Sequence, residues 1–226
     1  MMNDEFPKAV LFDWDGTLVN TLSFLLMAHN HVREQMALSP WSVSEFKSHV
    51  RYSSRELYAT AYGDQAGQAM ETLGVFMDEN HLQSIDILPD ALELLECLQE
   101  QDIPSALISN KRHDFLRKEV SHLGWDHFFK TTIGAGYAEK DKPAPDPLLL
   151  ALEECGLTAG KDIWYVGDSE TDICAAHAAG CTAILVRHHH DNEYLIEEFN
   201  PEFVFDDCKA LQNSILSYRQ RLVEKG

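Results

Sequence analysis

From Pro89 onward, short apolar runs alternate with amphipathic stretches of about ten residues. Apolar runs of this length are typical of buried strands, and periodic stretches that end at a glycine are typical of helices. The expected strands end at residue 12 and cover residues 105–108, 130–133, 163–166, 182–186 and 203–205; the expected helices cover 90–101, 114–123, 147–155, 170–179 and 208–223. This alternation predicts parallel βαβ units, and therefore an α/β fold built on a doubly wound parallel sheet.

Residues 20–88 have a different pattern, which is helical throughout and contains no expected strand. Leu22, Leu25 and Leu26 begin a series of apolar residues at helical spacing. Further on, Ser42 followed by Glu45 forms the pattern of a capping box, which predicts that a helix begins there. We therefore expect a core domain of residues 1–19 and 89–226, with residues 20–88 as an all-helical insertion.

The composition limits which classes of binding partner and which cellular compartment we expect for this chain. A formal net charge of −19 argues against nucleic acid, whose binding depends on clustered lysine and arginine. No apolar stretch is long enough to span a membrane, and residues 1–7 lack the pattern of a signal peptide. Five scattered cysteines without CxxC spacing argue against disulfides and zinc, and are typical of the reducing cytoplasm. We expect a cytoplasmic protein, and both a monomer and a dimer are compatible with the sequence.

Four polar clusters lie at the ends of predicted strands or just before a predicted helix. They are Asp13 with Asp15, Ser109 with Asn110, Lys142 in a Lys-Pro-Ala-Pro run, and Asp168 with Asp172 in residues 167–172. Ligands of open parallel sheets bind outside the carboxyl ends of the strands. If the strands are neighbours, the clusters meet in one crevice.

This set of side chains suits phosphoryl transfer. Carboxylates bind Mg²⁺ as hard oxygen ligands while the ion also takes a phosphate oxygen. One carboxylate can be the nucleophile, and a second can protonate the leaving oxygen and then deprotonate water. Lysine and serine can neutralise and hold the transferring group.

The order of these clusters also carries a family resemblance. The motifs are residues 13–18 (Asp-Trp-Asp-Gly-Thr-Leu), 109–111 (Ser-Asn-Lys), 142–145 (Lys-Pro-Ala-Pro) and 167–172 (Gly-Asp-Ser-Glu-Thr-Asp). With these motifs the chain resembles the haloacid dehalogenase superfamily, on its phosphatase side and close to phosphoglycolate phosphatases. The resemblance covers residues 8–19 and about 88–206, and it implies a Rossmann-like core with a mobile helical cap at residues 20–88.

The resemblance implies roles for the first motif. Asp13 would be the nucleophile and a metal ligand, and Asp15 the general acid and base, with its backbone carbonyl on Mg²⁺. An acid at position 15 favours phosphate esters over dehalogenation, because halide leaves without a proton. Trp14 stands where the family more usually has an aliphatic residue.

The other motifs receive roles in the same way. Ser109, helped by the backbone of Asn110, would hold the phosphoryl oxygens, and Lys142 would neutralise the nucleophile and the phosphate. Asp168 would complete the Mg²⁺ site with Asp172 in support. Asp172 also has a purely structural interpretation, because an acidic residue in the first turn of a helix is favoured by the helix dipole.

Two further features lie outside these motifs. Arg51 and Arg55 in the helical insertion could bind a substrate carboxylate, although solvated surface charges are an equally good interpretation. The tract from His188 to His190 resembles a metal-binding sequence, but we favour an exposed loop.

Together these observations predict a Mg²⁺-dependent phosphatase that acts on a small phosphorylated metabolite through an aspartyl-phosphate. The alternatives are a phosphomutase, pyrophosphatase or nucleotidase on the same core, and a non-catalytic binding protein that keeps the fold. The presence of Asp13, Asp15 and Lys142 favours an enzyme over the binding protein.

Overall fold

The computed structural model describes residues 6–49, 54–188 and 192–225, with side chains throughout except at 54–56 and 222–225. The strands of this part of the chain are β1 (Ala9–Phe12), β2 (Val19–Asn20), β3 (Asp86–Ile87), β4 (Ser105–Arg112), β5 (Phe129–Ala135), β6 (Ile163–Gly167), β7 (Thr182–Val186) and β8 (Phe203–Phe205). The α-helices are α1 (Leu22–Gln35), α2 (Val43–His49), α3 (Ser54–Tyr62), α4 (Ala66–Asn80), α5 (Ala91–Glu100), α6 (His113–His122), α7 (Asp146–Glu154), α8 (Glu170–Ala179), α9 (Glu193–Phe199) and α10 (Cys208–Lys225). Three short 3₁₀ helices are η1 (Gly63–Gln65), η2 (His81–Ser84) and η3 (Asp126–Phe128).

The main sheet has the strand order β5-β4-β1-β6-β7-β8, and all its pairs are parallel. Strand β1 lies between β4 and β6, so Leu11 pairs with Ala106 on one side and with Tyr165 on the other. All four residues of β1 are buried, which explains why this strand reads as an uninterrupted apolar run. The predicted doubly wound parallel sheet is confirmed.

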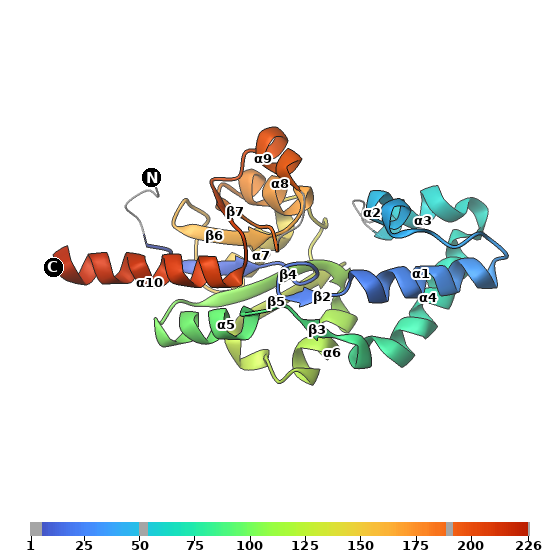
Figure 1. Cartoon of the computed structure of the whole chain (residues 1–226), viewed down its shortest axis with the longest axis horizontal. Helices are drawn as coiled ribbons and strands as arrows, with labels where there is room; N and C mark the ends of the chain where they lie inside the picture. The colour runs from blue at the N-terminus through green and yellow to red at the C-terminus, as the bar shows by residue number, and fades with distance from the viewer. Residues whose placement is uncertain (1–5, 50–53, 189–191, 226) are drawn as a thin grey trace. The chain divides into compact units, whose positions relative to one another are not determined.

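Helices cover both faces of this sheet (Figure 1). Helices α7, α8 and α9 pack on one face, where Leu148, Ile173 and Leu195 join the side chains of the strands in one apolar cluster. Helices α5, α6 and α10 lie on the opposite face. Helix α9 was not predicted, because it is short and only Leu195 of it is buried.

The chain divides into two compact units. The core unit comprises the described residues up to Val19 together with those from Ile87 on, and the helical unit runs from Asn20 to Asp86. The two-residue strands β2 and β3 pair with each other where the chain passes between the units. The prediction that residues 20–88 contain no strand is therefore wrong, because two residues are too few to show a period in the sequence.

The helical unit has its own core of buried aromatic side chains. Trp41, Phe46 and Tyr58 surround the imidazole of His29, with ring centroids 5.3–5.8 Å from it. Burial lowers the pKa of His29 to about 4, and its Nδ1 atom has no hydrogen-bond partner among the described residues. The predicted capping box is present before α2, where the Ser42 N–H donates to Glu45 Oε2 at 2.8 Å.

Two expectations from composition can be compared with the described residues. All five cysteines are free. No helix in the described part of the chain combines the length and the apolar character needed to cross a membrane.

Candidate active site

The first site residue follows directly from the end of β1. The Asp13 N–H donates to the carbonyl of Val166 at 2.9 Å, which continues the parallel pairing with β6 and fixes the direction of the Asp13 side chain. The chain then turns, and the N–H groups of Leu18 and Val19 both donate to the Trp14 carbonyl. The carboxylate of Asp13 is thus held, buried, at the carboxyl edge of the sheet.

Glycine at position 16 is required by this turn. Its φ is +86°, and a Cβ atom there would lie 2.3 Å from the Asp168 carboxylate oxygen Oδ2. Asp168 follows β6, the strand next to β1. Gly16 therefore lets the first loop approach the acidic side chain of the neighbouring strand.

Lys142 joins the clusters through its ammonium group. Its Nζ atom lies 2.7 Å from Asp13 Oδ1, 2.6 Å from Asp172 Oδ1 and 2.8 Å from the hydroxyl of Tyr165. The lysine side chain is only 3% exposed. A buried charge is stable only when it is paired and hydrogen-bonded, and Lys142 satisfies this condition.

The Asn110 side chain holds the loop that carries Lys142. Its amide nitrogen donates to the Lys142 carbonyl at 2.9 Å, and its amide oxygen accepts the Lys142 N–H at 3.0 Å. Next to it, the buried Ser109 accepts the Lys111 N–H at its Oγ, which leaves the proton of the hydroxyl itself for another acceptor. Ser109 can therefore donate to a bound oxyanion, while Asn110 places the lysine.

The pKa values of the central groups reflect their crowding. Burial raises the pKa of Asp13 to about 7, against the opposing effect of Lys142, and the charge of Asp172 raises it further. Burial opposes the charge on Lys142 too, but Asp13 and Asp172 outweigh it and raise the pKa of the lysine well above its usual value. The pKa of Asp168 is also raised well above its usual value, by burial and then by the charges of Asp172 and Asp13. Carboxyl groups therefore outnumber the single ammonium group, that of Lys142, in this cluster.

Such a cluster fits a divalent cation. One carboxylate oxygen from each of Asp13, Asp168 and Asp172 can be chosen so that all three lie within 4.8 Å of one another. Oxygen donors with excess negative charge are what Mg²⁺ requires. Both oxygens of Asp172 already accept protein hydrogen bonds, from Lys142 and from the Ser169 N–H of a capping box at the start of α8. Of the three carboxylates, Asp172 is thus the one whose two oxygens are held by Lys142 and by the backbone of Ser169.

Asp15 has a partner that the sequence did not reveal. Its Oδ1 atom lies 2.7 Å from the ammonium of Lys111, whose second partner is the buried carboxylate of Glu119 at 2.6 Å. Lys111 belongs to the Ser-Asn-Lys motif but was assigned no role, and Glu119 was not singled out. The available signal was a charged residue on the apolar side of its helix, where Leu116 and Val120 are its neighbours.

Two arginines and a histidine tract were also singled out in the sequence. Arg51 lies outside the described residues, and for Arg55 only the backbone is described. In the histidine tract, residues 189 and 190 lie outside the described part, but His188 is half-buried and its Nε2 atom lies 3.1 Å from the Thr17 carbonyl. His188 thus contacts the loop that follows β1.

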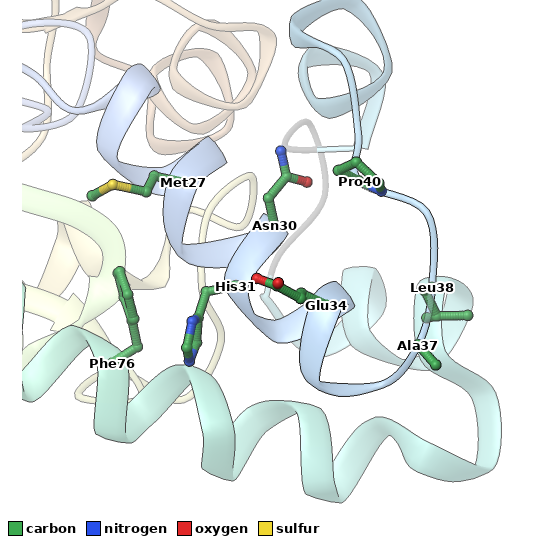
Figure 2. Close-up of a pocket in the computed structure, with 8 residues that line it drawn as sticks. All are labelled: Met27, Asn30, His31, Glu34, Ala37, Leu38, Pro40 and Phe76. Atoms are coloured by element: carbon green, nitrogen blue, oxygen red, sulfur yellow. The ribbon is translucent and has the colours of Figure 1, made fainter.

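The helical unit has a pocket of its own, with a volume of about 790 Å³ (Figure 2). Its lining comes from α1, the following loop and α4: Met27, Asn30, His31, Glu34, Ala37, Leu38, Pro40 and Phe76. The rings of His31 and Phe76 lie next to each other in this lining, with centroids 4.7 Å apart and a tilt of 30° between them. No predicted site residue whose side chain is described lines this pocket.

Comparison with known proteins decides the family. A family model described as haloacid dehalogenase-like hydrolase matches residues 10–186, which is most of the chain and includes all four motifs. The chain belongs to the haloacid dehalogenase-like hydrolase family. The predicted resemblance is confirmed.

Individual relatives agree with this assignment. The chain is 30% identical over 222 residues to a phosphoglycolate phosphatase of Haemophilus influenzae, a match that covers 93% of this chain and 98% of the relative. It is 28% identical to a phosphoglycolate phosphatase of Pseudomonas putida, covering 91% of this chain and 78% of that one. The crystal structure of a predicted phosphoglycolate phosphatase from Haemophilus somnus is similar with a TM-score of 0.81 at 26% identity, covering 94% of this chain and 99% of that one. The prediction of a family hydrolase similar to phosphoglycolate phosphatases is confirmed.

Proposed function

We propose that this hydrolase is a Mg²⁺-dependent phosphatase that cleaves a small phosphomonoester, with phosphoglycolate as the first candidate, through an aspartyl-phosphate on Asp13. The observation that carries the proposal is the pairing of a buried Asp13 with the Lys142 ammonium at 2.7 Å, next to the Asp168 carboxylate. The names of the relatives support the substrate class.

The first step forms the covalent intermediate. An oxygen of Asp13 attacks phosphorus, and the bond from phosphorus to the ester oxygen breaks. Asp15 donates its proton to that ester oxygen, which leaves as an alcohol. Ser109 and Lys142 hold the equatorial oxygens while charge moves across the phosphoryl group.

The second step restores the enzyme. Water attacks the phosphorus of the aspartyl-phosphate, its proton returns to Asp15, and the bond between Asp13 and phosphorus breaks to give inorganic phosphate. Asp13 and Asp168 would hold Mg²⁺, together with the backbone carbonyl of Asp15, and the ion when bound supplies neutralisation of the phosphate charge. Asp172 contributes by keeping Lys142 in place.

The helical unit, as a cap, has the task of selecting the substrate in this proposal. Arg51 and Arg55 would recognise a carboxylate on the substrate, because guanidinium groups bind carboxylates in a bidentate way. Substitution of either arginine by methionine should raise KM for phosphoglycolate. It should leave KM unchanged for ethyl phosphate, which has no carboxylate.

A panel of phosphate esters tests the reaction. Phosphate release is measured for phosphoglycolate, sugar phosphates, nucleoside monophosphates and pyrophosphate, with Mg²⁺ and with EDTA. We expect metal-dependent hydrolysis of a small monoester, which Asp13→Asn abolishes. The matched control is Asp102→Asn, an exposed aspartate at a turn, which should keep wild-type turnover. Turnover that survives Asp13→Asn would show that the nucleophile is wrongly assigned.

A further inference from the structure

Lys111 is held more tightly than an ordinary surface lysine. Its side chain is 5% exposed, and its ammonium lies 2.7 Å from Asp15 Oδ1 and 2.6 Å from Glu119 Oε2. Strand β4, which carries Lys111, pairs directly with β1, the strand that precedes Asp15. The lysine therefore reaches Asp15 from a neighbouring strand of the same rigid sheet.

Glu119 is an unusual residue for its place in α6. It is 1% exposed and shares the buried side of the helix with Phe115, Leu116 and Val120. A carboxylate in such surroundings destabilises the fold unless it is paired and hydrogen-bonded. Its Oε2 atom accepts one hydrogen bond from the ammonium of Lys111 and another from the indole N–H of Trp14 at 2.7 Å. The carboxylate of Glu119 is thus fixed from two sides.

The contacts of Trp14 give a structural reason for a tryptophan where the family more usually has an aliphatic residue. The residue lies between Asp13 and Asp15, is fully buried, and packs edge-on against Trp125 with ring centroids 5.8 Å apart. An aliphatic side chain at this position would fill space but could not donate to Glu119. The indole therefore adds a link between the β1 loop and α6.

We propose that Lys111 is a positioning residue that holds the carboxyl group of Asp15 toward the leaving oxygen of the substrate, and that Glu119 and Trp14 fix Lys111 for this task. The inference rests on the proposed function, in which Asp15 passes a proton to that oxygen. The Glu119 carboxylate balances the lysine charge, so the pair offers Asp15 a hydrogen-bond donor without a net positive charge. The side chain of Asp15 is 23% exposed, and the ammonium of Lys111 holds its Oδ1 atom at 2.7 Å.

Two substrates with different leaving groups distinguish a misplaced Asp15 carboxyl group from a general loss of active-site structure. An alkoxide is a poor leaving group and needs the proton of Asp15, whereas p-nitrophenolate leaves readily as an anion. Loss of the Asp15 position should therefore slow the first step on an alkyl phosphate much more than on p-nitrophenyl phosphate. The second step needs Asp15 for both substrates, so p-nitrophenyl phosphate should then show a burst followed by slow turnover.

The test uses the double variant Lys111→Met/Glu119→Gln, which removes both buried charges and leaves neither one unpaired. Wild type, Asp15→Asn and the exposed Lys118→Met of the same helix are measured beside it. On an alkyl phosphate that the wild type hydrolyses, kcat of the double variant should fall by about 10- to 100-fold, the size expected when a reacting group is misplaced. KM should stay within about threefold, since substrate binding does not depend on the proton donor. Lys118→Met should match wild type.

The burst supplies the second readout. With p-nitrophenyl phosphate the double variant should release about one nitrophenolate per active site at close to the wild-type rate before turnover slows. Trp14→Phe, which keeps the ring and loses the donor, should show the same pattern with a smaller loss.

Two results would overturn the inference: wild-type kcat of the double variant on the alkyl phosphate, or equal slowing of the first step for both substrates. The proposed function is judged separately by Asp15→Asn. If that variant hydrolyses the alkyl phosphate normally, the acid role of Asp15 is wrong. If Asp15→Asn loses activity and the double variant does not, only the role of Lys111 is wrong.

Discussion

Replacing Lys142 by methionine should destabilise the core unit strongly in the absence of metal. The substitution keeps most of the side-chain volume but removes the ammonium that lies within 2.7 Å of two buried carboxylates, Asp13 and Asp172. Removing one partner of a buried ion pair leaves an uncompensated charge and typically costs about 3–5 kcal/mol. Since whole domains are stable by only about 5–15 kcal/mol, the variant should lose a large share of its free energy of unfolding.

The assay is urea unfolding in EDTA, followed by circular dichroism and by tryptophan fluorescence. The matched control is Lys140→Met, an exposed lysine two residues away, which should unfold within about 0.5 kcal/mol of wild type. The double variant Lys142→Met/Asp172→Asn should recover part of the loss, because it removes one of the two unpaired carboxylates. If Lys142→Met unfolds like Lys140→Met, Lys142 is not an essential counter-charge for the buried carboxylates.

Other predictions follow from single contacts. Because burial lowers the pKa of His29 from 6.5 to about 4, the folded state should be fully stable above pH 6.5 and should lose about 3 kcal/mol as the pH falls toward 4. Urea unfolding of wild type and of His29→Phe at pH 7 and pH 4.5 checks this, and an equal pH effect in both proteins would contradict it. Gly16→Ala should weaken Mg²⁺ binding by at least tenfold in calorimetric titration, because its Cβ would lie 2.3 Å from Asp168 Oδ2 and its φ of +86° is unfavourable for alanine. Gly67→Ala, in a helix and with nothing within 4 Å of the added atom, should bind Mg²⁺ like wild type, and equal affinity of both variants would refute the close approach of Gly16.

The sheet was predictable from the sequence because its central strands β1, β6 and β7 are buried on both faces. The runs that end at Phe12, Ile108 and Val166 are apolar without interruption, as expected for strands of a parallel sheet that is covered by helices on both faces. Local patterns were equally informative where the interaction is local, as in the capping box of Ser42 and Glu45. Strand β3 was missed because two residues carry no periodicity.

The site was predictable only in part, for a related reason. Asp13 and Lys142 belong to motifs, so their meeting could be inferred from the order of the motifs along the chain. The pairing of Lys111 with Asp15 depends on the side-by-side placement of β4 and β1, and Glu119 reaches it from a helix. Nothing in the local sequence encodes such a contact across elements, apart from the position of Glu119 on an apolar helix face.

The measurement that tests the central claim most directly is the capture of the phosphorylated enzyme. Wild type is mixed with Mg²⁺ and a phosphate ester that it hydrolyses, quenched in acid during turnover, and digested for peptide mass spectrometry. We expect one phosphoryl group on the peptide that contains Asp13, at the carboxyl group of that residue, and none in Asp13→Asn. A phosphoryl group on Ser109 or on any other residue, or rapid turnover without a phosphorylated enzyme in wild type, would contradict it.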